Sequence, residues 1–113
     1  MTFKVSDPIF RLVSVDNTAL LLATGEEARM TVVFDYAGNN GCAVTLPSAS
    51  DAGEGYVVDI WHRGEGGNVT VNRGGVDTIF TFDRQSLNSE AFATGNRKKF
   101  ISDGSSRWFS ATN

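Results

Sequence analysis

The chain has 113 residues, of which 41% are hydrophobic and 20% charged, and its formal net charge is −3. This composition is typical of a globular protein, and the length suits one domain. The acidic balance argues against nucleic acid as the main partner, because phosphate binding relies on clustered Lys and Arg. Cys42 is the only cysteine, which excludes an intrachain disulfide. No apolar run has the length of a signal peptide or a membrane helix, so we predict a cytoplasmic site of synthesis and no membrane partner.

Strand-like runs rich in β-branched and aromatic residues recur between clusters of Gly, Asn, Asp and Ser, and helical periodicity is nearly absent. Alternation is clear at residues 56–61, where Tyr56, Val58 and Ile60 share one face and Trp61 lies on the other. The segment 83–93 is predicted as a loop or an irregular strand. The predicted strands are 9–15, 19–23, 29–35, 42–46, 56–62, 68–72, 78–82, 98–102 and 107–111.

The connections carry residues that favour tight turns. Residues 37–41 contain Gly and Asn, which tolerate positive φ and suit a hairpin. The glycines at 64–67 and 74–75 bracket a short strand in the same way, and residues 102–106 form a tight link between the last two strands. We therefore predict an all-β fold, a single small β-sandwich or jelly-roll-like domain over residues 1–113, with residues 1–10 as a candidate N-terminal arm.

Few side chains have the chemistry of a catalytic or metal site. His62 is the only histidine, and an acid–base role would need a partner that orients it, so we interpret it as a strand-end residue. Cys42 is interpreted as a small buried hydrophobe, not as a nucleophile. One Cys and one His do not make a structural zinc site. We predict no cofactor and no metal.

Acidic and glycine-rich segments offer only weak alternatives. Asp51, Glu54 and Asp59 do not follow the spacing of a calcium loop, and we interpret them as solvated carboxylates. The glycines at 64–67 lead into a strand and not into a helix, which argues against a phosphate site. A glycan hydrolase would need two carboxylates about 5–10 Å apart. Asp51, Glu54, Asp77 and Asp83 are available, but nothing singles out a pair of them.

One basic run, Arg97 to Lys99, precedes Phe100. A basic run beside an aromatic residue can bind nucleic acid. In a net-acidic chain we favour a charged edge strand that discourages unwanted pairing, or a contact to an acidic protein surface.

The aromatic residues have three possible roles, which are core packing, an oligomer interface and a platform that stacks on sugars. Trp108 and Phe109 are neighbours on a predicted strand, so they cannot both point into one core. One of them is therefore a candidate for a subunit contact.

The order of motifs between residues 44 and 109 resembles the small β modules of tailed-bacteriophage virions, which occur on capsid surfaces and on tail fibres. Three motifs carry the resemblance. A Val-Thr-Leu-Pro strand begins at Val44, and a Gly-x-Gly turn at Gly53 leads into an alternating strand. An Asp-Gly-x-x-x-Trp segment, one residue longer than the Asp-Gly-x-x-Trp of these modules, ends at Trp108. The first 43 residues have no counterpart in these modules.

The resemblance implies a non-enzymatic capsid decoration (cement) protein, present on the virion head as a homotrimer bound to the major capsid protein. A tail-fibre tip that engages a host glycan or protein is the alternative. A chain that begins at Met1 and lacks a shaft favours decoration over a fibre. The candidate capsid or subunit contacts are Phe3, Pro8, Ile9, Phe10, Trp61, Trp108 and Phe109.

Overall fold

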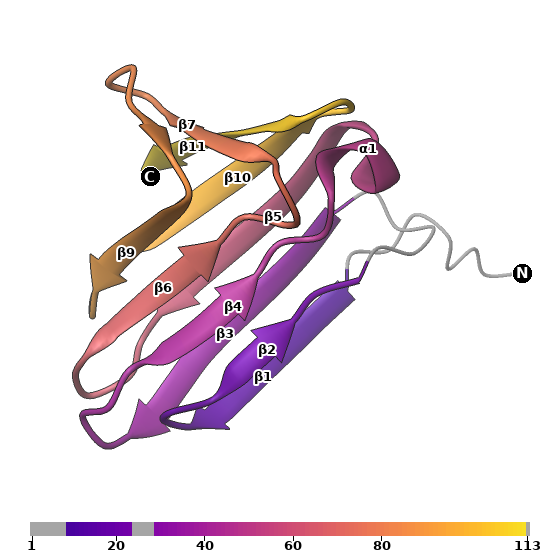
Figure 1. Ribbon diagram of the computed structural model, residues 1–113. Helices are drawn as coiled ribbons and strands as arrows, with labels where there is room; N and C mark the ends of the chain where they lie inside the picture. Colours follow the sequence, from indigo (N-terminus) through magenta and orange to yellow (C-terminus); the bar gives the residue numbers. More distant parts are fainter. Residues whose placement is uncertain (1–8, 24–28, 113) are drawn as a thin grey trace, which may run out of the picture.

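The computed structural model describes residues 9–23 and 29–112, which form eleven strands and one short helix (Figure 1). The all-β prediction is confirmed. The elements are β1 (Ile9–Val15), β2 (Ala19–Leu21), β3 (Arg29–Ala37), β4 (Cys42–Thr45), α1 (Ala49–Ala52), β5 (Glu54–His62), β6 (Asn68–Asn72), β7 (Thr78–Thr81), β8 (Ser86–Leu87), β9 (Ser89–Ala93), β10 (Arg97–Asp103) and β11 (Arg107–Thr112).

The first six strands form a small β-solenoid of about three turns. The chain alternates between two sheets, with β1, β3 and β5 parallel in one and β2, β4 and β6 parallel in the other. Figure 1 shows the second set lying over the first. The predicted sandwich or jelly roll is therefore wrong. Those folds are built from antiparallel strands, whereas each coil here returns to its sheet in the same direction and pairs in parallel.

The turn predictions have two different outcomes. Residues 38–41 join β3 to β4, which lie in different sheets, so this turn is a corner of the solenoid and not a hairpin. The link at residues 104–106 does join paired strands, because β10 and β11 are antiparallel neighbours. Turn residues specify that the chain reverses, but they do not specify whether the next strand stays in the same sheet.

The C-terminal strands end the parallel stack. The larger sheet has the order β1-β3-β5-β10-β11-β7-β8, and β10 pairs antiparallel with both β5 and β11. In the smaller sheet, β9 pairs antiparallel with β6. The basic run Arg97 to Lys99 thus belongs to a central strand, and the prediction that it forms a charged edge strand is wrong.

The core lies between the two sheets and is made of side chains stacked from one coil to the next. Val32 lies opposite Ile60 in the larger sheet, and Val44 lies opposite Val71 in the smaller one. All four are fully buried. Because alternate residues of a strand face opposite ways, each buried row leaves a second row on the outside of its sheet.

One corner of the solenoid requires glycine. Gly67 has a φ of +72°, and a Cβ placed on it would lie 2.4 Å from the backbone nitrogen of Gly41. Two corners of successive coils therefore touch through their backbones at this point, which leaves no room for a side chain.

Candidate interaction face

The segment between β4 and β5 collects side-chain hydrogen bonds from distant parts of the chain. The indole Nε1 of Trp108 donates to the Pro47 carbonyl at 3.1 Å. The backbone N–H of Ala49 donates to Asp77 Oδ2 at 2.7 Å, and the Ala49 carbonyl accepts from Ser102 Oγ at 2.8 Å. The Leu-Pro and Asp-Gly-x-x-x-Trp segments thus meet in the fold, where they fasten β10 and β11 to the helical corner.

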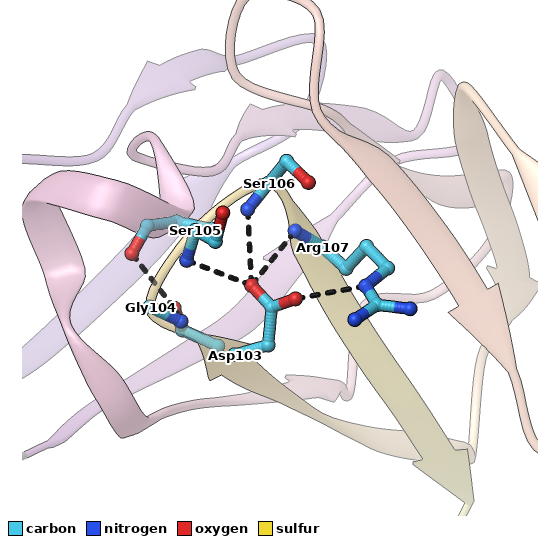
Figure 2. A network of polar contacts seen from close by, with 7 residues as sticks. Asp103, Gly104, Ser105, Ser106 and Arg107 are labelled. Carbon is cyan, nitrogen blue, oxygen red and sulfur yellow. Dashed lines mark hydrogen bonds and ion pairs between the residues drawn. The ribbon is translucent and has the colours of Figure 1, made fainter.

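The turn between β10 and β11 is organised by one carboxylate (Figure 2). Asp103 Oδ1 accepts backbone hydrogen bonds from Ser105, Ser106 and Arg107 at 2.8 to 3.0 Å, and Oδ2 accepts from Arg107 Nε at 2.8 Å. The hydrogen bond from the Arg107 side chain, followed by those from the backbone, holds the pKa of Asp103 well below its ordinary value. The aspartate of the Asp-Gly-x-x-x-Trp segment therefore shapes the turn.

Replacing Asp103 with asparagine should destabilise the protein at neutral pH and much less in acid. A folded-state pKa below the unfolded value of about 3.9 gives stability that is present above that value and is lost as the pH falls below it. We expect the difference in urea midpoint between the native chain and Asp103→Asn to narrow as the pH falls below about 4. Asp35→Asn, at an exposed position of β3, is the matched control. A difference that stays constant down to the lowest workable pH would contradict this account.

The outer side of the seven-stranded sheet carries a surface that we call the aromatic face. Ile101 and Phe109 are cross-strand partners on it, while their neighbours Phe100 and Trp108 are fully buried on the other side. Four of its side chains remain strongly exposed, at 63% for Phe10, 59% for Leu12, 38% for Ile101 and 42% for Phe109. The aromatic face consists of Phe10, Leu12, Trp61, Phe80, Ile101 and Phe109.

Two arginines lie on this face and pack against its rings. The guanidinium of Arg97 is 4.6 Å from the Trp61 ring centroid and forms a bidentate pair with Asp59, at 2.7 and 3.0 Å. The guanidinium of Arg107 lies 5.5 Å from the centroid of the Phe80 ring and 5.6 Å from that of Phe109. Such contacts fix flexible side chains before any partner arrives, which lowers the entropic cost of binding.

A shallow hollow of about 430 Å³ crosses the same face between β3, β5 and β10. Arg29 and Lys99 line it, and neither forms an ion pair with another described residue. The indole N–H of Trp61, which also lines the hollow, is buried and has no acceptor among the described residues. The hollow therefore places two cations that have no ion-pair partner among residues 9–23 and 29–112 beside aromatic surface.

The structure brings three of the predicted contact residues together. Phe10, Trp61 and Phe109 all belong to the aromatic face. Trp108 is completely buried in the core, so of the neighbouring pair only Phe109 is available to a partner. The prediction that the two point in opposite directions is confirmed.

The predicted N-terminal arm lies mostly outside the described residues. Phe3 and Pro8 fall in residues 1–8, which the structure does not describe. Ile9 and Phe10 pair with Met30 and Thr31, so these two positions belong to β1 and not to an arm.

His62 and Cys42 have structural roles. His62 ends β5 and is buried, where its Nδ1 accepts the backbone N–H of Gly64 at 3.1 Å. Its Nε2 then carries the proton and donates to the Gly67 carbonyl at 3.0 Å. Cys42 is buried, with its Sγ 3.6 Å from the Val15 carbonyl. The interpretations of a strand-end histidine and a small buried cysteine are confirmed.

The carboxylates considered for a calcium site or a glycan-hydrolase site do not form one group. Asp77 is buried and accepts the backbone N–H of Ala49, and Asp51, Glu54 and Asp83 are exposed. Asp59 is buried and paired with Arg97, so its interpretation as a solvated carboxylate is wrong. Within residues 9–23 and 29–112, no three His, Cys, Asp or Glu side chains are grouped so that they could hold a metal ion. In the same part of the chain, no helix has the length and hydrophobicity needed to cross a membrane.

Sequence reasoning missed a second feature, a polar cavity near the C-terminal end. Its volume is about 270 Å³, and Glu90 and Lys98 contribute to its wall. Their sequence positions contain a signal, because Glu90 is two residues from buried Phe92 and Lys98 is two residues from buried Phe100. Strand alternation therefore places both charges on the inward side.

Comparison with protein-family models, with curated proteins and with solved structures finds no match for this chain. Its function is therefore inferred from the aromatic face, from the polar cavity and from the motif resemblance.

Proposed function

We propose that this chain is a non-enzymatic capsid decoration protein of a tailed bacteriophage, which binds the outside of the head as a homotrimer and stabilises the shell. The aromatic face is the observation that carries this proposal. The motif order between residues 44 and 109 is what directs it to a phage virion. The aromatic face supports binding to another protein, and the motif resemblance supports the phage head as the place where this binding occurs.

The aromatic face has the composition of a protein–protein interface. Aromatic residues and arginine are enriched in interface cores, and the residues that dominate binding energy are mainly Trp, Tyr and Arg. Here Trp61 lies under Arg97, and Phe109 lies beside Arg107. The exposed apolar side chains of β1 and of β11 lie on either side of the hollow that Arg29 and Lys99 line, so apolar surface and positive charge are interspersed on this face. The face is thus suited to be covered by another protein.

Charge favours a partner with carboxylates at its surface. Arg97 and Arg107 are already paired with Asp59 and Asp103, whereas Arg29 and Lys99 have no ion-pair partner among the described residues. The chain as a whole carries a net charge of −3, so the positive charge of Arg29 and Lys99 on this face is opposite in sign to the charge of the whole protein. A capsid surface that presents Asp and Glu would complement them and would increase the rate of encounter.

Decoration stabilises a shell by mass action. A protein that binds the assembled capsid, and not its separated subunits, makes disassembly more costly by the free energy of binding. An interface of standard size, about 1,600 Å² in total, is sufficient for specific attachment. In a trimer, three copies of the aromatic face would bind at once, which raises the apparent affinity well above that of one copy.

The location of the protein on virions tests the proposal. A gold-labelled antibody against the chain, viewed by electron microscopy, should mark the whole surface of the heads. Label confined to the tail would replace decoration with receptor binding. Absence of label from every particle would overturn the virion assignment.

A charge placed on the aromatic face should weaken attachment to heads. We expect Ile101→Glu and Phe109→Glu each to lower affinity for heads stripped of the protein by about a hundredfold, because an unpaired carboxylate would be buried on binding. Co-sedimentation with stripped heads measures the effect. Val76→Glu is the matched control, because Val76 is exposed in the loop between β6 and β7 and is not part of the aromatic face. Equal loss in the control, or no loss in the two face variants, would contradict the assignment of this face.

A further inference from the structure

The wall of the polar cavity combines β9 of the smaller sheet with β7, β10 and β11 of the larger one. Figure 1 shows these four strands at one end of the fold. Lys98 lies opposite Ile60, and Glu90 lies opposite Val71. Both partners are fully buried in the core. Lys98 and Glu90 therefore occupy inward-facing positions that are apolar in the preceding coils. At this end of the fold the apolar core is replaced by a polar cavity.

The charges are paired but incompletely satisfied. Lys98 Nζ is 3.2 Å from Glu90 Oε2 and donates to Thr112 Oγ1 at 2.8 Å. The second oxygen of the carboxylate, Glu90 Oε1, is buried and accepts no hydrogen bond from the described residues. A buried acceptor without a donor destabilises the fold, and apolar residues would stabilise this position better. A polar group of this kind in a native structure needs an explanation, and Glu90 contributes to the wall of the cavity.

We infer that this cavity binds a single neutral sugar ring. Its wall combines hydroxyl groups with carboxylates, and Phe82 lies at its rim with 90% of its surface exposed. A pyranose presents hydroxyls around its edge and C–H groups on its faces. It therefore needs polar groups like the hydroxyls of Ser110 and Thr112 and the carboxylate of Asp83, together with an apolar surface like that of Phe82. The lining residues are Thr81, Phe82, Asp83, Glu90, Lys98, Ser110 and Thr112.

Charge and size narrow the class of ligand. Glu90 and Lys98 compensate one another, which leaves Asp83 as the excess charge in the wall and disfavours anionic ligands. The volume of about 270 Å³ is just below the range of about 300 to 1,000 Å³ that is typical of sites for drug-sized molecules. One ring, such as the end or a branch of a longer glycan, matches this space.

The sugar site goes beyond the proposed decoration of the head. None of its lining residues belongs to the aromatic face, but Thr81, Phe82 and Ser110 also line a second hollow together with Phe80, Ile101 and Phe109 of that face, so the two surfaces are neighbours. Sugar binding is measured on the free chain and attachment on stripped heads, so failure of one proposal is distinguishable from failure of the other.

Saturation-transfer difference NMR with the full chain tests the site. The probes are the methyl glycosides of glucose, galactose, mannose, rhamnose and N-acetylglucosamine, with glucuronic acid as an anionic comparison. We expect transfer to at least one neutral glycoside and none to glucuronic acid. Phe82→Ala should weaken that binding by about tenfold through loss of the stacking surface. Glu90→Gln should weaken it as well, because it removes the ion pair that holds Lys98 in the cavity wall.

Phe109→Ala is the matched control, since it also removes an exposed phenylalanine but lies outside the cavity wall. Because the Phe82 side chain is almost fully exposed, its removal should leave the fold intact, and circular dichroism would verify this. The inference is overturned if no neutral glycoside binds the native chain. It is equally overturned if Phe82→Ala and Phe109→Ala bind a responding glycoside as well as the native chain does.

Discussion

Replacing Trp108 with alanine should lower the free energy of unfolding by about 3 to 5 kcal/mol, the range for truncating a buried aromatic side chain. Trp108 is completely buried, and its indole N–H satisfies the Pro47 carbonyl across 61 positions of the chain. The substitution removes both the packing and the hydrogen bond that fastens β11 to the corner before α1. Since domains of this size are stable by about 5 to 15 kcal/mol, the variant should approach the limit of folding.

Two further variants separate the causes of this loss. Trp108→Phe keeps most of the buried surface but leaves the Pro47 carbonyl without its donor, so we expect a smaller cost of about 1 to 3 kcal/mol. Phe109→Ala removes an aromatic ring from the neighbouring, exposed position and should cost less than about 1 kcal/mol. Urea denaturation followed by circular dichroism measures all three. A Trp108→Ala variant as stable as Phe109→Ala would show that the hydrogen-bonded corner does not support the fold.

Gly67→Ala is the second substitution for which we expect a large effect, with a loss of about 2 to 5 kcal/mol. The φ of +72° at Gly67 is strained for any residue with a Cβ, and the added atom would lie 2.7 Å from the Cα of Gly41. Because both neighbours are backbone atoms of the adjacent coil, a rotamer change cannot relieve the clash. The two corners would have to separate, which would disturb the parallel pairing of β4 with β6.

Gly95→Ala is the control that isolates the strain from the clash. Gly95 has a φ of +87°, but nothing lies within 4 Å of a Cβ placed there. We expect it to cost only the conformational strain, about 1 to 2 kcal/mol. Equal denaturation midpoints for the two variants would mean that the close approach of the corners does not contribute to stability.

The strands could be predicted from the sequence because their signal is local. Alternation of apolar and polar residues located β1 and β6 at their observed bounds, and it placed Val58 and Ile60 on one face, which the structure buries in the core. The arrangement of the strands was not accessible in the same way. The coils of the solenoid share no sequence repeat, and the corner at residues 38–41 has the same turn chemistry as a hairpin. Only the parallel pairing of β3 with β5, which is non-local, distinguishes the observed solenoid from the predicted sandwich.

The site shows the same division between local and non-local information. Phe109 was a candidate contact because it neighbours Trp108, and alternation requires that only one of them enter the core. The joining of Phe10, Trp61 and Phe109 on one face depends on the order of β1, β5 and β11 in the sheet, which no local pattern encodes. The pairing of Glu90 with Lys98 likewise depends on β9 and β10 meeting across the core from different sheets.

The assignment of the aromatic face is tested most directly by hydroxyl-radical footprinting of the chain, free and bound to heads. We predict that Phe10, Leu12, Ile101 and Phe109 become protected in the bound state. Leu21 and Val76, which are strongly exposed but lie away from this face, should be oxidised equally in both states. Protection of Leu21 and Val76 while the four residues of the aromatic face stay reactive would contradict the proposal that this face holds the protein on the shell.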